Sequence, residues 1–199
     1  MPSPKAQGDL DYFCGMYAVV NAYQACGEKS ERASEQIFDA SCAAVRPSRW
    51  PIVVRDGTKI DDMQRMLRKC QEAIPRLARI RISFPFIRNT PNPASYWREF
   101  DLIWQKQKAV CAIVGIRKPI DHWIVVRRDR TPGRLVIIDS HPGWPARRSV
   151  SRSSIFAGTE KGRTKKSLLF VRSELILFSC PTGSSRGPRK TTSPSKRAD

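Results

Sequence analysis

The sequence predicts an α+β domain in which the helices come first and the strands second. Amphipathic segments occupy the first part of the chain, and apolar runs bounded by turn residues occupy the second. This order is typical of helices that pack on an antiparallel sheet. A length of 199 residues suits one domain with one substantial core. We therefore predict a single domain over residues 1–180 and a disordered basic tail over residues 181–199.

Three helices are expected in the first part of the chain. The first spans about residues 14–26 and ends at Gly27, a residue type favoured at helix C-termini. The second ends near residue 45 and the third spans about residues 59–73, and the proline-containing segment 46–51 between them is expected to be a loop. Spacings of three and four between apolar residues give each helix one buried face. In the first helix this face comprises Met16, Val19, Val20 and Tyr23.

Strands are expected mainly in the second part of the chain. Apolar or alternating runs predict them at about residues 77–86, 109–116, 122–126, 134–139 and 167–179. Ser95 is expected to cap a further helix that lies before the second of these strands. The segment 146–166 is basic and poor in apolar residues, so it is expected to be a mobile loop.

The start of the first helix carries a candidate nucleophile, Cys14. Unpaired N–H groups and the positive end of the helix dipole favour the thiolate form of a cysteine at this position. Gly15 leaves the sulfur unshielded and would let a substrate backbone approach closely. Taken alone, a cysteine in an apolar run is more often part of a core, so the interpretation depends on finding a base.

The chain contains two histidines, and His122 lies at the beginning of an apolar strand. Asp139 closes the next strand, and the turn residues 128–133 between the two strands indicate a hairpin. An antiparallel pair places the start of its first strand beside the end of its second, so His122 and Asp139 should be neighbours. A carboxylate that orients an imidazole, which in turn pairs with a thiolate, is the arrangement needed for nucleophilic catalysis.

These residues resemble those of a known group. The pattern Cys-Gly-x-Tyr-Ala-x-x-Asn-Ala from Cys14, with Gln7 upstream, His122 at a strand start and Asp139 one hairpin later, is similar to the papain-like cysteine peptidases. It looks most like their compact bacterial branch, which includes the bacteriocin-leader peptidases. The resemblance implies a papain-like fold with the nucleophile helix packed on an antiparallel sheet. It also implies a catalytic triad of Cys14, His122 and Asp139, with an oxyanion hole formed by Gln7 and the Cys14 backbone N–H.

The expected activity is hydrolysis of a peptide or isopeptide amide through an acyl-enzyme, without a cofactor or a metal ion. Transamidation and glutamine deamidation share the acyl-enzyme step and remain open at this point. Gly15, Trp123 and Trp144 are expected to line the substrate cleft. Trp123 and Trp144 also have a structural interpretation, since buried aromatic residues at strand starts are common. The order of glutamine, cysteine, histidine and aspartate, each at the end of its element, favours the catalytic reading.

The formal charge of +18 predicts an anionic partner. A protein or peptide substrate with an acidic surface fits, and a non-catalytic basic module that binds acidic protein or nucleic acid is the alternative function. Nucleic-acid binding would be non-specific because no named recognition motif is present. The N-terminus has no apolar signal region, no run is long enough to span a membrane, and the six cysteines lack C-x-x-C spacing. We therefore expect a reduced cytoplasmic bacterial protein, with secretion as an effector by a non-classical route, the disulfide state and the oligomeric state left open.

Overall fold

The computed structural model describes residues 12–118, 120–141, 143–157 and 168–180. Its helices are α1 (Cys14–Ala25), α2 (Glu31–Ala43), α3 (Trp50–Asp56), α4 (Ile60–Ala73) and α5 (Tyr96–Lys106). Its strands are β1 (Arg81–Ser83), β2 (Ala109–Lys118), β3 (His122–Arg128), β4 (Arg134–Ile138), β5 (Arg147–Ser151), β6 (Ile155–Phe156) and β7 (Leu168–Ser179). The predicted oxyanion residue Gln7 and the predicted tail over residues 181–199 lie outside the described residues.

The strands form one sheet in the order β1-β7-β2-β3-β4-β5, and β6 pairs with β7 beside this path. Every pairing is antiparallel except that of β6 with β7. The predicted α+β class is therefore confirmed, with most helices before most strands. Within the described residues, none of the helices combines the length and the apolar character needed to cross a bilayer.

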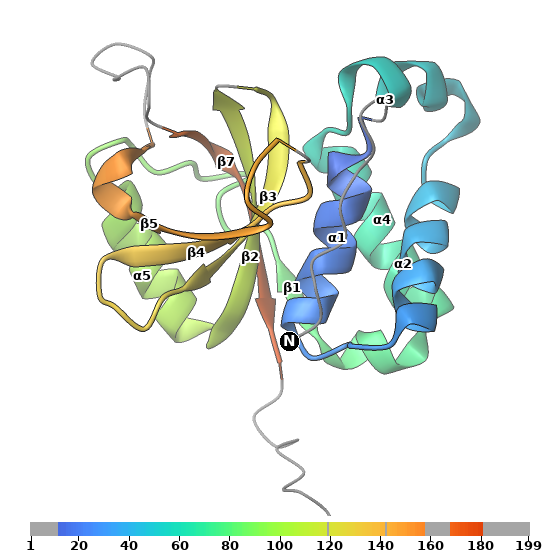
Figure 1. Ribbon diagram of the computed structural model, residues 1–199, viewed down its shortest axis with the longest axis horizontal. Coiled ribbons are helices and arrows are strands. Elements are labelled where there is room, and N and C mark those ends of the chain that lie inside the picture. The colour runs from blue at the N-terminus through green and yellow to red at the C-terminus, as the bar shows by residue number, and fades with distance from the viewer. Residues whose placement is uncertain (1–11, 119, 142, 158–167, 181–199) are drawn as a thin grey trace, which may run out of the picture.

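Helix α1 lies between the sheet and the helices α2 and α4 (Figure 1). It packs on β2 and β3, while α5 covers the opposite face of the sheet. The alternation of side chains along β2 serves both faces: Cys111 and Ile113 join the core on the α1 side, and Ala112 and Val114 join the core on the α5 side. The predicted apolar face of α1 is confirmed, because Met16, Val19, Val20 and Tyr23 are all buried.

Two predictions made for the segments between the helices and the sheet are wrong. The segment 46–51 is not a loop, because a short 3-10 helix at Pro47–Arg49 leads directly into α3. Proline is tolerated in the first turn of a helix, where its missing N–H would have no partner, so the prolines mark helix starts here. The strand predicted over residues 77–86 is observed only as β1. Residues 75–79 form a 3-10 helix, and the pairing with β7 involves only Arg81–Ser83.

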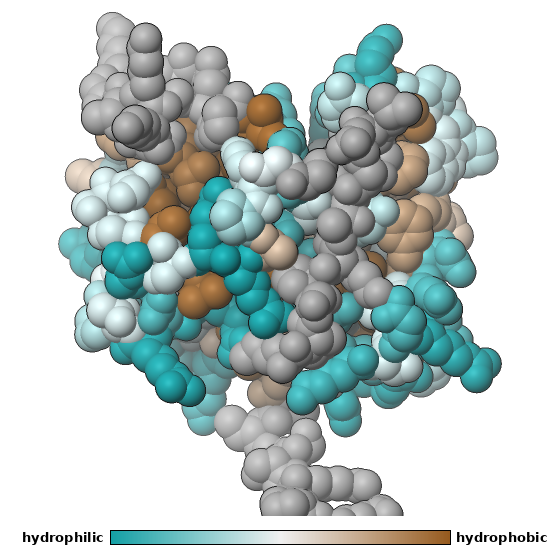
Figure 2. Space-filling view, viewed as in Figure 1, coloured by the Kyte–Doolittle hydropathy of each residue, from teal (hydrophilic) through white to brown (hydrophobic). Residues whose placement is uncertain are grey.

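Two further predictions fail in the second half of the chain. Ser95 is the N-cap residue of α5, but its hydroxyl bonds the Asn92 carbonyl at 3.4 Å and caps no helical N–H. The described part of the predicted loop, residues 146–157, is not a loop throughout, since β5 pairs along β4 within it, and residues 158–166 lie outside the described residues. Strand β5 is the last in the sheet order, and charged residues on an edge strand discourage pairing with another chain. Figure 2 shows a band of hydrophilic side chains beside several hydrophobic ones over the region of β4 and β5.

Candidate functional site

The structure brings Cys14, His122 and Asp139 together from three parts of the chain. Cys14 is the first residue of α1, after the N-cap residue Phe13. His122 is the first residue of β3, and Asp139 directly follows β4. The pairing of Val125 with Ile138 places the start of β3 beside the end of β4, as an antiparallel hairpin requires.

The imidazole of His122 links the other two side chains. Its Nε2 lies 2.7 Å from Asp139 Oδ1, and both side chains are shielded from solvent, at 2% and 0% exposure. The Cys14 thiol lies close enough to the imidazole to raise the pKa of His122. Because Asp139 occupies Nε2, Nδ1 is the nitrogen that remains for the sulfur. This is the arrangement of nucleophile, base and orienting carboxylate predicted from the sequence.

The protonation of His122 is set by opposing effects. Burial by itself would lower its pKa, but hydrogen bonds to Asp139 and Cys14, together with their negative charges, raise the pKa to about 9. At neutral pH the imidazole is therefore protonated and can stabilise a thiolate beside it. An imidazolium in this position also holds the proton that a leaving amine needs.

The surroundings of Asp139 fix its orientation. Its Oδ1 accepts a second hydrogen bond, from the His141 backbone N–H at 2.9 Å, while Oδ2 lies 3.8 Å from a guanidinium nitrogen of Arg148. Arg148 in turn stacks over the Trp144 ring at 4.4 Å. Nothing in the sequence pattern singles out Arg148, because it lies in a segment expected to be a loop.

Trp144 packs on His122 and is not among the residues that line the cavity beside Cys14. Its ring lies edge-on to that of His122, with centroids 5.9 Å apart and an interplanar angle of 89°. The second histidine, His141, contacts both rings. Together with Trp144 it helps to bury His122, which strengthens the bond between His122 and Asp139 by excluding water.

A cavity of about 320 Å³ opens beside the sulfur. Its lining comprises Cys14, Asp56, Gly57, Thr58, Lys59, Ile60, Ile116, Arg117, Asp121, His122, Trp123, Val171 and Glu174. Trp123 thus lies on the cleft wall as expected, whereas Trp144 and Gly15 are not among the lining residues. A smaller hollow of about 210 Å³ between α1 and α2 contains none of the three triad residues.

Gly15 has a packing role that differs from the one predicted. A Cβ at this position would lie 2.0 Å from Thr58 Oγ1 and 2.9 Å from Met63 Sδ. The absent side chain therefore admits the loop before α4 against the nucleophile helix, and Gly15 itself is buried. The glycine thus brings one wall of the cavity close to Cys14.

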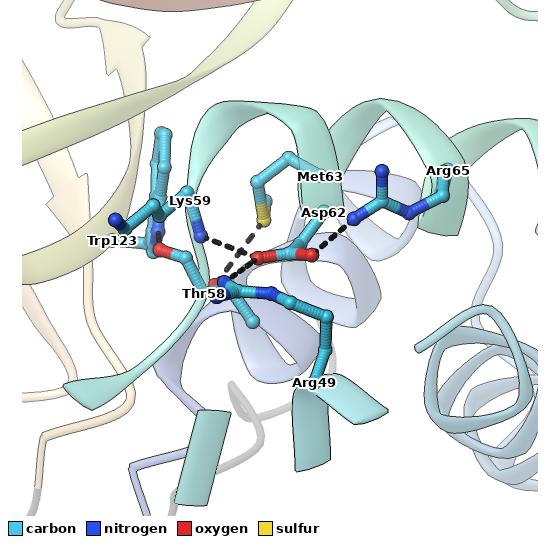
Figure 3. A network of polar contacts seen from close by, with 7 residues as sticks. All are labelled: Arg49, Thr58, Lys59, Asp62, Met63, Arg65 and Trp123. Carbon is cyan, nitrogen blue, oxygen red and sulfur yellow. Dashed lines mark hydrogen bonds and ion pairs between the residues drawn. The ribbon is translucent and has the colours of Figure 1, made fainter. Parts of the chain in front are cut away.

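That wall is held by a polar network around Asp62 (Figure 3). The buried carboxylate accepts hydrogen bonds from Arg49 at 2.8 Å, from the Lys59 backbone N–H at 3.0 Å, and from Arg65. The arginines outweigh the effect of burial, so the pKa of Asp62 is lowered. Trp123 Nε1 donates to the Thr58 carbonyl at 2.9 Å, which joins the wall to the strand that carries His122.

Of the two predicted oxyanion donors, the Cys14 backbone N–H lies within the described residues. The Cys14 backbone N–H lies in the first turn of α1, where a helix offers no internal acceptor. Gln7 lies outside the described residues, so its role stays a prediction. Comparison with protein-family models, with curated proteins and with solved structures finds no match for this chain.

Proposed function

We propose that the protein is a papain-like thiol hydrolase that cleaves a peptide or isopeptide amide through an acyl-enzyme. The single observation that supports this most strongly is the contact of Cys14 with His122, which is held by Asp139 at one end of a cavity large enough for part of a peptide. A core cysteine needs no imidazole, and a buried histidine needs no cavity. Their joint placement at element ends is what nucleophilic catalysis requires.

The reaction begins with attack of the Cys14 thiolate on the amide carbonyl, forming a C–S bond and a tetrahedral oxyanion. The Cys14 N–H, with Gln7 as the expected second donor, stabilises this oxyanion. The C–N bond then breaks as the His122 imidazolium gives its proton to the leaving amine. The neutral imidazole next takes a proton from water, the hydroxide attacks the thioester carbonyl, and the thiolate leaves as the acid is released.

The second half of the reaction decides between hydrolysis and transfer. An amine that replaces water at the thioester would give transamidation, and a glutamine side chain as substrate would give deamidation. The first half of the reaction is the same in all three cases, so the triad supports each of them equally. We propose hydrolysis because water needs no acceptor site of its own. The formal charge of +18 favours a protein substrate with an acidic surface. As expected from the sequence, the proposed place of action is the cytoplasm.

Selective alkylation tests this proposal. With iodoacetamide at pH 6.5, we expect Cys14 to be modified well before the other five cysteines. Hydrogen bonds with neighbouring thiols, and then burial, raise the pKa of the Cys26 and Cys180 thiols. Burial raises the pKa of Cys42 and raises that of Cys70 to about 11. Cys111 is inaccessible at 0% exposure. Intact mass spectrometry with peptide mapping gives the site and rate. Labelling spread evenly over several thiols would contradict the proposal.

The raised pKa of His122 predicts the alkaline limit of activity. Amide cleavage needs the imidazolium, so kcat/KM should hold through neutral pH and fall as the pH rises through about 9. In Asp139→Asn the carboxylate charge that raises this pKa is lost, so the descending limb should move to lower pH. The rate of hydrolysis of a peptide amide, followed from pH 5 to 10, gives the descending limb in both the wild-type protein and Asp139→Asn. A limb that stays in place in Asp139→Asn would remove Asp139 from this role.

A further inference from the structure

A carboxylate that the reaction does not use shares the cavity with Cys14. Glu174 belongs to β7, where the register with β2 shifts: Val114 pairs with Leu175, but Ile116 pairs with Phe170. The pairing advances two residues along β2 and five along β7, so residues 171–174 form a bulge opposite Gly115. Bulges re-aim side chains, and this one contributes Val171 and Glu174 to the cavity lining.

Gly115 makes room for that carboxylate. A Cβ on Gly115 would lie 1.9 Å from Glu174 Oε2, so the acid occupies the space that any other residue would fill. Gly115 pairs across the sheet with Trp123, and the next residue of β2 pairs with His122. The carboxyl group is thus held over the strand pair that presents the catalytic imidazole, as part of the sheet and not of a surface loop.

The other acidic groups of the cavity have cationic partners at its mouth. Asp56 receives two hydrogen bonds of 2.9 Å from Arg55, and the exposed Asp121 lies 3.9 Å from Arg117. Glu174 is half-buried, and burial raises its pKa although Arg117 acts against this, while Asp121 adds to it. Among the side chains that the structure describes, no arginine or lysine lies within ion-pair distance of Glu174, whereas Asp56 and Asp121 each have one. A cation that entered would recover much of that cost.

We propose that Glu174 forms a specificity subsite that takes the cationic side chain of a lysine or arginine in the substrate. This rests on the proposed function, because the substrate must be bound with its carbonyl at Cys14. Long flexible side chains can reach a recessed carboxylate while their backbone lies across the cavity mouth, and arginine can bond both oxygens. The net positive charge of the protein attracts acidic surfaces from a distance, whereas Glu174 selects one side chain at contact range.

Matched electrophilic peptides test this subsite without knowledge of the natural substrate. Tripeptidyl acyloxymethyl ketones carry arginine at one position at a time, each compared with its citrulline counterpart, which has the same shape and no charge. The rate of Cys14 alkylation is followed by intact mass spectrometry. At one position we expect arginine to react roughly 10- to 100-fold faster than citrulline, the range for hydrogen bonds to charged groups. In Glu174→Gln this ratio should fall to near one.

The outcomes separate the two proposals. Equal arginine and citrulline rates at every position in the unmodified protein overturn the subsite while leaving Cys14 as the nucleophile, and this comparison stands even if Glu174→Gln does not fold. The subsite is also overturned if the preference for arginine over citrulline survives in Glu174→Gln. The same holds if this preference is lost equally in Asp121→Asn, which changes a carboxylate at the cavity mouth. If no ketone labels Cys14, the proposed function fails and the subsite with it.

Discussion

Replacing Cys14 with alanine is expected to lower amide hydrolysis by at least on the order of 10⁴-fold, because loss of a catalytic nucleophile removes the covalent route altogether. The fold should survive, since Cys14 opens α1 and the helix buries its apolar face through other residues. Turnover of a peptide mixture, followed by mass spectrometry of new termini, measures the loss. Circular dichroism and thermal unfolding verify that the variant is folded.

A second cysteine provides the matched control. Cys42 is half-exposed on α2, away from the cavity lining, and Cys42→Ala should retain full activity. Cys14→Ser keeps the shape but replaces a good nucleophile with a poor one, so it should be nearly as inactive as alanine. Hydrolysis that persists in a correctly folded Cys14→Ala protein would contradict an acyl-enzyme mechanism through Cys14.

The local part of the site was predictable from the sequence. A cysteine at the start of an apolar helical run lies in the first turn of that helix. A hairpin places the start of its first strand beside the end of its second strand. The positions of Cys14, His122 and Asp139 on their elements follow from these two rules. The packing of that helix on the sheet was implied by the resemblance, and the structure shows it in the contacts of α1 with β2 and β3.

The rest of the site depends on contacts between distant segments that no local pattern encodes. The β7 bulge inserts extra residues into a run that the sequence predicts as one regular strand, so the place of Glu174 in the cavity follows from pairing with β2 and not from a local pattern. Gly15 suggested open space for a substrate beside Cys14. The space that a side chain at Gly15 would take is occupied by Thr58, which lies 43 positions later in the chain. Arg148 lies in a segment expected to be a loop, and its contact with Trp144 depends on the pairing of β5 with β4.

The Asp62 carboxylate explains why the wall beside Cys14 holds its shape, and Asp62→Asn should destabilise the protein by about 2–3 kcal/mol. The amide cannot satisfy both arginines and the Lys59 N–H as the carboxylate does. Arg49 and Arg65 keep partial access to water, at 17% and 26% exposure, so the loss should stay below that of a fully buried ion pair. The melting temperature should fall by roughly 4–12 °C.

The pH dependence of this loss identifies its origin. The folded state lowers the pKa of Asp62, so its contribution is present above the unfolded value of about 3.9 and is lost as the pH falls through the folded value. The difference in unfolding free energy between the two proteins should therefore be constant near neutrality and narrow in acid. Urea unfolding at pH 7 and at pH 3 measures it. Asp61→Asn, an exposed change on the same helix, should have little effect at either pH, and an equal loss in this control would show that helix charge alone is responsible.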